Sequence, residues 1–128
     1  MEDIFYLSRR QLSPADIAVP LRTAGTPRVF ADSVQLFYDR DEFWDFCFMS
    51  GGDRGGFEPV QRAKLEELGV STLLCVSFHV ASLPKLIPIL GNLMIHYGGW
   101  VALDDGEFAR LYDSASIGQL ILEYGRSS

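Results

Sequence analysis

Hydrophobic and polar residues alternate along several short segments of this chain, and a two-residue period is typical of strands. Residues 33–38 and 43–48 alternate in this way on either side of the polar turn 39–42, and both are rich in aromatic residues. We therefore expect a β-hairpin there. Residues 4–7 form another short β-rich run. Residues 71–80 are almost continuously apolar, which predicts a central strand covered on both faces.

Other segments repeat their hydrophobic residues every three or four positions, the spacing of one buried helix face. The clearest is the predicted helix 83–97, whose apolar face consists of Leu83, Leu86, Ile87, Leu90, Leu93 and Met94. A helix is also expected over 14–22, because Ser13 is a preferred N-cap and Pro14 suits the first helical position. Two further helices are expected: 57–68, with Val60, Leu65 and Leu68 on one side, and 116–124, with Ile117, Leu120, Ile121 and Tyr124 facing inward.

Two more strands are expected late in the chain, over residues 100–103 and 107–112, separated by the turn 104–106. The order of strands and helices predicts an α+β fold. We expect a single domain over residues 1–128, with one mixed β-sheet and helices mainly on one face. A domain of 128 residues buries roughly two-thirds of the surface that its unfolded chain exposes, so it needs no metal or disulfide to fold.

The charge of the chain narrows the class of partner. Acidic residues outnumber basic ones by 17 to 11, the net charge is −6, and the one basic cluster is Arg9-Arg10. Nucleic-acid binding depends on Lys and Arg that neutralise phosphates, so we expect neither a nucleic acid nor an anionic membrane as partner. An acidic protein suits a basic partner, because complementary charge raises the association rate.

The cysteines and the N-terminal residues indicate a reducing compartment. Cys47 and Cys75 lie in apolar strand-like runs without the spacing of a metal site, so we expect buried, reduced thiols. Glu2 and Asp3 stand where a signal peptide would carry positive charge. The apolar stretch 83–97 is interrupted by prolines and polar residues and is too short to span a bilayer. We expect a cytoplasmic protein.

Two features could support catalysis or ligand binding, and neither is strong. The loop 50–56 follows a predicted strand but lacks the Gly-Lys-Ser/Thr ending of a phosphate-binding loop. Cys75 and His79 point to the same face of one predicted strand, but four residues of extended chain separate them by roughly 13 Å, too far for a nucleophile and its base. We therefore expect no enzyme, no catalytic residue, no metal ligand and no cofactor.

Two acidic turns are the candidate partner-binding sites. Neither has the spacing of a calcium loop, and exposed aromatic residues beside such charge, Trp44 or Phe43, would be suitable interface anchors. The residues expected to contact a partner are Asp39, Asp41, Glu42, Trp44 and Asp45 in the first turn, and Asp104, Asp105 and Glu107 in the second.

Three segments resemble the immunity proteins of bacterial contact-dependent growth inhibition and related polymorphic-toxin systems. They are the opening Asp3-Ile4-Phe5-Tyr6-Leu7-Ser8, the helical Leu83-Pro84-Lys85-Leu86-Ile87-Pro88-Ile89-Leu90, and Gly98-Gly99-Trp100-Val101 followed by Asp104-Asp105-Gly106-Glu107-Phe108. The segment 110–128 departs from that pattern. The resemblance implies a small cytosolic protein that neutralises the C-terminal domain of a cognate toxin, often a nuclease, by occluding its active site.

Two other functions stay open at this point. The chain could be a small ligand-binding or enzymatic domain that uses the Gly51–Gly56 loop and the strand bearing Cys75 and His79. It could also be a regulatory or scaffolding subunit with an unrelated partner. A toxin gene next to the gene for this chain would favour the immunity function over both.

Overall fold

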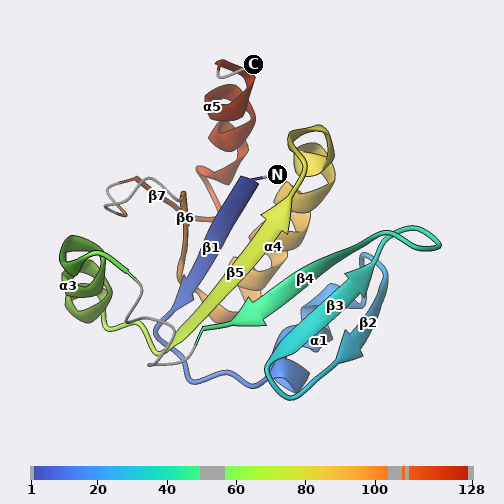
Figure 1. Ribbon diagram of the computed structural model, residues 1–128, viewed down its shortest axis with the longest axis horizontal. Coiled ribbons are helices and arrows are strands. Elements are labelled where there is room, and N and C mark those ends of the chain that lie inside the picture. Colours follow the sequence, from blue (N-terminus) through green and yellow to red (C-terminus); the bar gives the residue numbers. More distant parts are fainter. Residues whose placement is uncertain (1, 50–56, 104–107, 109, 127–128) are drawn as a thin grey trace.

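A computed structural model describes residues 2–49, 57–103, 108 and 110–126 of the chain. Seven strands form one sheet in the order β2-β3-β4-β5-β1-β6-β7, with helices beside it (Figure 1). The elements are β1 (Glu2–Ser8), α1 (Pro14–Leu21), β2 (Thr26–Val29), β3 (Ser33–Phe37), β4 (Phe43–Phe48), α3 (Pro59–Leu68), β5 (Thr72–Phe78), η1 (Val80–Ser82), α4 (Leu83–Tyr97), β6 (Trp100–Leu103), β7 (Leu111–Tyr112), η2 (Ile117–Gln119) and α5 (Leu120–Arg126).

The α+β class is confirmed, and β5 is the middle strand of the seven, as expected. Every registered strand pair among the described residues is antiparallel, however, so the sheet is not mixed. The reason lies in the position of β1. The helix α4 connects β5 to β6, which run in the same direction, but β1 is inserted between them and pairs antiparallel with both.

One face of the sheet carries the main hydrophobic core under α1 and α4. Alternate residues of β1, β4 and β5 point to this face, where they meet the apolar side of α4. The buried side chains there include Ile4, Tyr6, Trp44, Phe46, Leu74, Val76, Phe78, Leu86, Leu90 and Leu93. This packing explains why the bounds of α4 match the predicted helix, since all but one of its expected apolar positions are buried.

The helices α1 and α4 are fixed to each other and to the sheet by polar contacts. Ser13 is the N-cap of α1, as the sequence indicated, and it forms a capping box with Asp16. The Asn92 side chain of α4 donates a hydrogen bond to the Pro20 carbonyl of α1 over 3.0 Å. The Tyr6 hydroxyl donates to the Gly98 carbonyl over 2.7 Å, which joins β1 to the end of α4.

The second face is covered at one end only. A smaller cluster beneath α3 contains Phe5, Leu7, Leu65, Leu73, Ala102 and Phe108. Beyond this cluster no described helix covers the sheet, and the alternate residues of β2 to β5 are exposed or half-buried. We call this region the open face; it comprises Asp3, Arg28, Gln35, Phe37, Phe43, Asp45, Cys47, Cys75 and Ser77.

Several sequence-based expectations were wrong in detail. The strand β2 was not predicted. It contains Pro27, and proline is tolerated in an edge strand such as this one. Val60 and Ile121 are exposed rather than inward-facing. The last predicted strand is reduced to β7 among the described residues. Cys47 and Cys75 are half-buried thiols on the open face rather than core residues, and β5 is therefore covered on both faces only in its first half.

Candidate partner-binding surface

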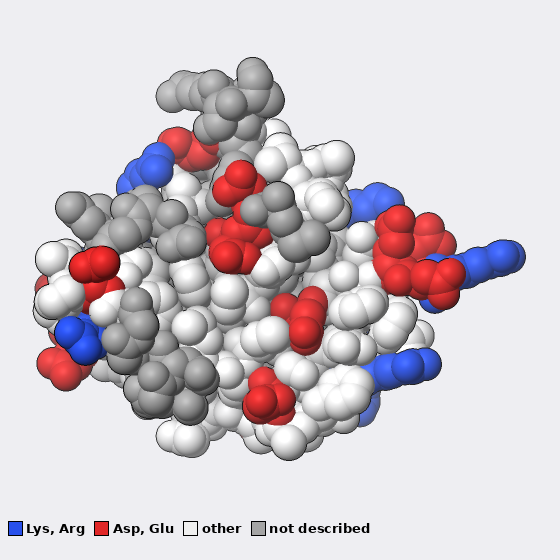
Figure 2. Space-filling view, viewed as in Figure 1, with Lys and Arg blue, Asp and Glu red and all other residues white. Residues whose placement is uncertain are grey.

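The first acidic turn connects β3 to β4 and extends beyond the rest of the sheet (Figure 1). The main-chain amide of Tyr38 donates a hydrogen bond to the Glu42 carbonyl over 3.1 Å, which closes the turn. The side chains of Asp39, Arg40, Asp41 and Glu42 are all exposed. Figure 2 shows the resulting group of acidic atoms at one end of the molecule, with basic atoms beside it.

The two aromatic residues after this turn have opposite environments. Trp44 is 2% exposed, points to the helix-covered face and stacks on the Tyr38 ring with 3.9 Å between ring centroids. Trp44 is therefore a core residue, and the expectation that it is an exposed aromatic side chain beside the turn was wrong. Phe43 is 42% exposed and points to the open face. Because neighbouring strand residues face opposite sides of a sheet, only one of the two could be available to a partner.

Phe43 belongs to a small cross-strand group that the sequence analysis did not identify. Its ring lies 5.0 Å from the ring of Phe37, and the Arg28 guanidinium lies 4.8 Å from the Phe37 ring centroid. The strand register explains the group, because Phe37 pairs with Phe43. The polar positions Ser33 and Gln35, which alternate with buried Val34 and Leu36, were the available signal for an exposed face of β3.

Asp45 lies on the same open face and is half-buried. Its Oδ1 atom is enclosed and accepts no hydrogen bond from the described residues. Burial, and then the neighbouring Asp45 carboxylate, raise the pKa of the Cys47 thiol to about 11. A carboxylate in a poorly solvated site disfavours formation of a thiolate beside it. Because the thiolate is the reactive form of cysteine, Cys47 is a weak nucleophile at neutral pH.

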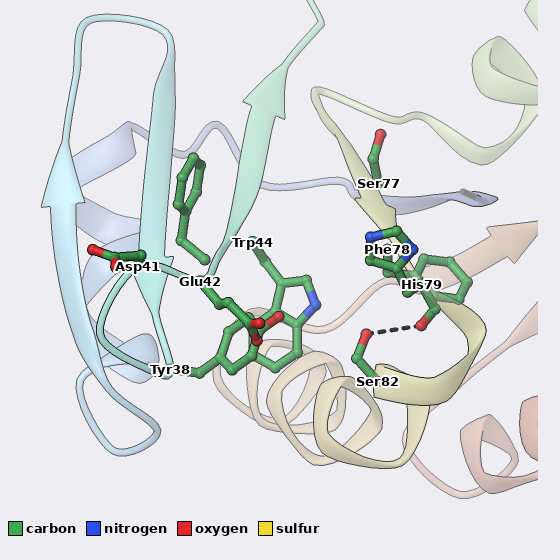
Figure 3. A pocket seen from close by; sticks show the side chains of 9 residues that line it. Tyr38, Asp41, Glu42, Trp44, Ser77, Phe78, His79 and Ser82 are labelled. Carbon is green, nitrogen blue, oxygen red and sulfur yellow. Dashed lines mark hydrogen bonds between the residues drawn. The ribbon is translucent and has the colours of Figure 1, made fainter.

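A hollow of about 250 Å³ lies between the acidic turn and the end of β5 (Figure 3). The register of β4 with β5 covers Phe46–Phe48 and Leu74–Val76 and does not continue beyond Phe46, so the two strands separate there. Tyr38, Glu42 and Trp44 lie on one side of the hollow, and Phe78, His79 and Ser82 lie on the other. Asp41 also lines it, but its carboxylate points away from the centre in Figure 3.

The polar groups around this hollow are partly engaged. The Ser82 hydroxyl donates to the His79 carbonyl over 2.8 Å, and the Ser77 hydroxyl donates to the Asp3 carboxylate. Burial, and then the Glu42 carboxylate beside it, raise the pKa of Tyr38. The Lys85 ammonium lies 5.9 Å from the centroid of the Tyr38 ring. A cation of α4 therefore lies near one of the rings that line the hollow.

The structure places Cys75 and His79, the residues of the enzymatic alternative, in different surroundings. Cys75 lies opposite Cys47 in the register of β4 and β5, whereas His79 lies past the end of β5 and lines the hollow. The Gly51–Gly56 loop lies outside the described residues, as do Asp104, Asp105 and Glu107 of the second acidic turn. Among the described residues, no three His, Cys, Asp or Glu side chains are grouped as metal ligands.

A larger, uncharged hollow of about 630 Å³ lies along α4. Its lining comes from α4, from the residues after α1 and from the segment around η2, and it includes Ile87, Ile89, Ile95 and Ile117. Ile95 is 73% exposed. None of the described residues that line this hollow is charged, so they offer no charge that would attract a basic partner.

No protein-family model, curated protein or solved structure matches this chain. None of the described helices is long and apolar enough to cross a membrane.

Proposed function

We propose that this chain binds a basic partner protein through the 39–42 turn and the adjacent open face, and that the partner is the toxin domain implied by the resemblance to immunity proteins. The observation that carries this proposal is the exposed turn itself. It presents three carboxylates and one guanidinium beyond the edge of the sheet, directly next to the exposed Phe43 ring. An acidic projection beside an aromatic side chain suits a cationic cleft on a partner.

Charge and apolar contact have separate roles in this surface. The carboxylates of Asp39, Asp41 and Glu42 increase the rate at which a basic protein meets the surface. The Phe43 ring supplies apolar area that loses water in the complex, which is the usual source of interface affinity. Phe37 supports that ring from the neighbouring strand, so little conformational freedom is lost on binding.

The dimensions of the hollow favour a protein partner over a small molecule. Pockets for small ligands span roughly 300–1,000 Å³ and enclose most of the ligand. The hollow beside the turn has about 250 Å³ and is lined by residues of an exposed turn. It is large enough for one side chain of a partner. For the hollow beside the turn, we therefore favour a side chain of a partner protein over a small ligand.

The decisive test is to find whether a gene beside that of this chain encodes a toxin domain, and to measure binding of this chain to that domain. The variant Asp41→Asn with Glu42→Gln removes two exposed charges from the turn without changing side-chain size. The matched control is Glu66→Gln with Glu67→Gln, which removes two exposed charges from α3. We expect the turn variant to associate more slowly at low salt, on the order of tenfold, and the control to match the wild type.

Salt dependence and a protection assay complete the test. The difference between the turn variant and the wild type should shrink as added salt shortens the screening length to about 8 Å or less. Cells that produce the toxin domain should survive when they also produce this chain. A chain that neither binds nor protects against that domain would contradict the immunity function. Equal slowing by both variants would instead show that net charge, not this turn, guides the partner.

A further inference from the structure

The two cysteines face each other across neighbouring strands. Cys47 of β4 and Cys75 of β5 are direct partners in the antiparallel register, and both side chains point to the open face. The sequence separates them by 28 positions, so only the pairing of these strands brings them together. Both are half-buried thiols in the structure. Small reagents can therefore reach this site from the open face.

The hydrogen-bonding pattern determines how close the two residues lie. The Met49 amide donates to the Leu73 carbonyl over 2.9 Å, which marks Met49 and Leu73 as a hydrogen-bonded pair. Such pairs alternate along an antiparallel ladder, so Cys47 and Cys75 form the next one. The Cα atoms of such a pair are about 5.5 Å apart, inside the range of about 4.4–6.8 Å found in disulfides.

We propose that Cys47 and Cys75 form a reversible disulfide that joins β4 to β5. The Cβ atoms of a hydrogen-bonded pair lie near the upper end of about 4.5–5.5 Å, whereas a disulfide needs about 3.5–4.5 Å. The strands must therefore move slightly closer when the bond forms. A bond formed under such strain is more easily reduced than a structural disulfide, which makes this site a switch rather than a permanent crosslink.

The position of the pair gives the bond a mechanical effect. The ladder between β4 and β5 has three registered pairs, whereas the ladder between β1 and β5 has seven. The pair is the central one of those three, and it therefore lies in the ladder that joins the two halves of the sheet. Beyond it the strands separate around the hollow. Oxidation should stiffen this connection between β2-β3-β4 and β5-β1-β6-β7.

The reaction needs a low-molecular-weight disulfide as oxidant, such as oxidised glutathione. One thiolate attacks a sulfur of the oxidant, forming a mixed disulfide and releasing one molecule of reduced thiol. The second cysteine loses its proton and attacks the protein sulfur of the mixed disulfide, releasing a second reduced thiol. The protein loses two protons and two electrons, and both electrons reduce the oxidant. Burial and the Asp45 carboxylate disfavour the thiolate of Cys47.

The test uses the whole chain and oxidised glutathione, with no partner present, so it does not depend on the proposed function. We expect a monomer whose mass falls by two hydrogen atoms and whose cysteines resist alkylation after unfolding, with dithiothreitol restoring both thiols. Amide hydrogen exchange should slow across β4 and β5 in the oxidised form. The double variant Cys47→Ser with Cys75→Ser should be unchanged by the oxidant.

The single variants isolate the first of the two steps. Cys47→Ser and Cys75→Ser should each stop at a stable mixed disulfide with glutathione, because neither has a second thiol that could displace it. Circular dichroism confirms that each variant is folded. Wild-type protein that carries two glutathiones, forms disulfide-linked dimers or keeps both thiols would overturn the proposal.

Discussion

Alternate residues of the same strands point to opposite faces of the sheet, and the two faces differ in burial and in chemical character. On β4, Trp44 and Phe46 are buried under the helices, while Phe43, Asp45 and Cys47 point to the open face. The helix-covered face is closed by apolar contacts and by hydrogen bonds to α4. The open face combines carboxylates, an aromatic pair and two thiols. One face therefore holds most of the buried apolar area, while the carboxylates, aromatic rings and thiols of the other face stay partly accessible to solvent.

The largest effect is expected where the covering helix returns to the sheet. Gly99 has a φ of +93°, and a Cβ there would lie 2.0 Å from the Leu7 carbonyl oxygen of β1. Gly98 has a φ of +69°, but a Cβ there would contact nothing within 4 Å. Gly99→Ala should therefore lower the free energy of unfolding by more than about 4 kcal/mol, and Gly98→Ala by about 1–3 kcal/mol, since Gly98 also has a backbone conformation that favours glycine. Urea unfolding measures both, and equal losses would contradict the close approach of the two backbones.

The next prediction compares two sides of the same helix. Leu90 of α4 is fully buried against the sheet, whereas Ile95 of α4 is largely exposed. Leu90→Ala leaves a cavity and should cost about 2–5 kcal/mol. Ile95→Ala should change the free energy of unfolding by less than about 0.5 kcal/mol. Similar losses in urea unfolding would show that α4 does not form one side of the core.

The third prediction concerns pH. Burial raises the pKa of Tyr6 from 10.0 to about 12. Below pH 10 both states keep the proton, so Tyr6 causes no pH dependence there. Between pH 10 and 12 the unfolded state loses its proton first, so the free energy of unfolding falls as pH rises.

The variant Tyr6→Phe isolates this contribution. It should be about 1 kcal/mol less stable at neutral pH, because it lacks the hydroxyl that donates to Gly98. It should also lose less stability than the wild type between pH 10 and 12. Urea midpoints of the two proteins at matched pH values give the difference, in which the other titrating groups cancel. Parallel pH profiles would contradict the burial of this hydroxyl.

The smallest effect on stability is expected on the open face. Asp45→Asn should change the free energy of unfolding by less than about 0.5 kcal/mol, because it keeps the shape of a half-buried side chain. It should nevertheless lower the pKa of Cys47, since it removes the negative charge beside the thiol. Alkylation rates against pH in a Cys75→Ser background measure that pKa. Asp32→Asn is the control, because Asp32 contributes least among the groups that raise it.

Local patterns in the sequence were sufficient for several elements. The helix α4 matches its predicted bounds because its apolar spacing is regular and Gly98-Gly99 ends it. The start of α1 follows from Ser13 and Asp16, which are three positions apart and complete a capping box without help from the rest of the chain. The β3–β4 hairpin follows from alternation around a polar turn. In each case the determining interactions are local.

The sequence alone determined which residues alternate, but the tertiary structure decided which set is buried. Phe43 and Trp44 are adjacent and both aromatic, so hydropathy could not predict which of them is buried. Trp44 is buried because the helices pack on the face to which it points. The pairing of Cys47 with Cys75 depends on the register of β4 with β5. Even the short strand β2, which contains Pro27, forms because it can pair with β3 at the edge of the sheet. Periodicity is set by backbone geometry within a few residues, whereas the covering of a face is set by contacts between distant segments.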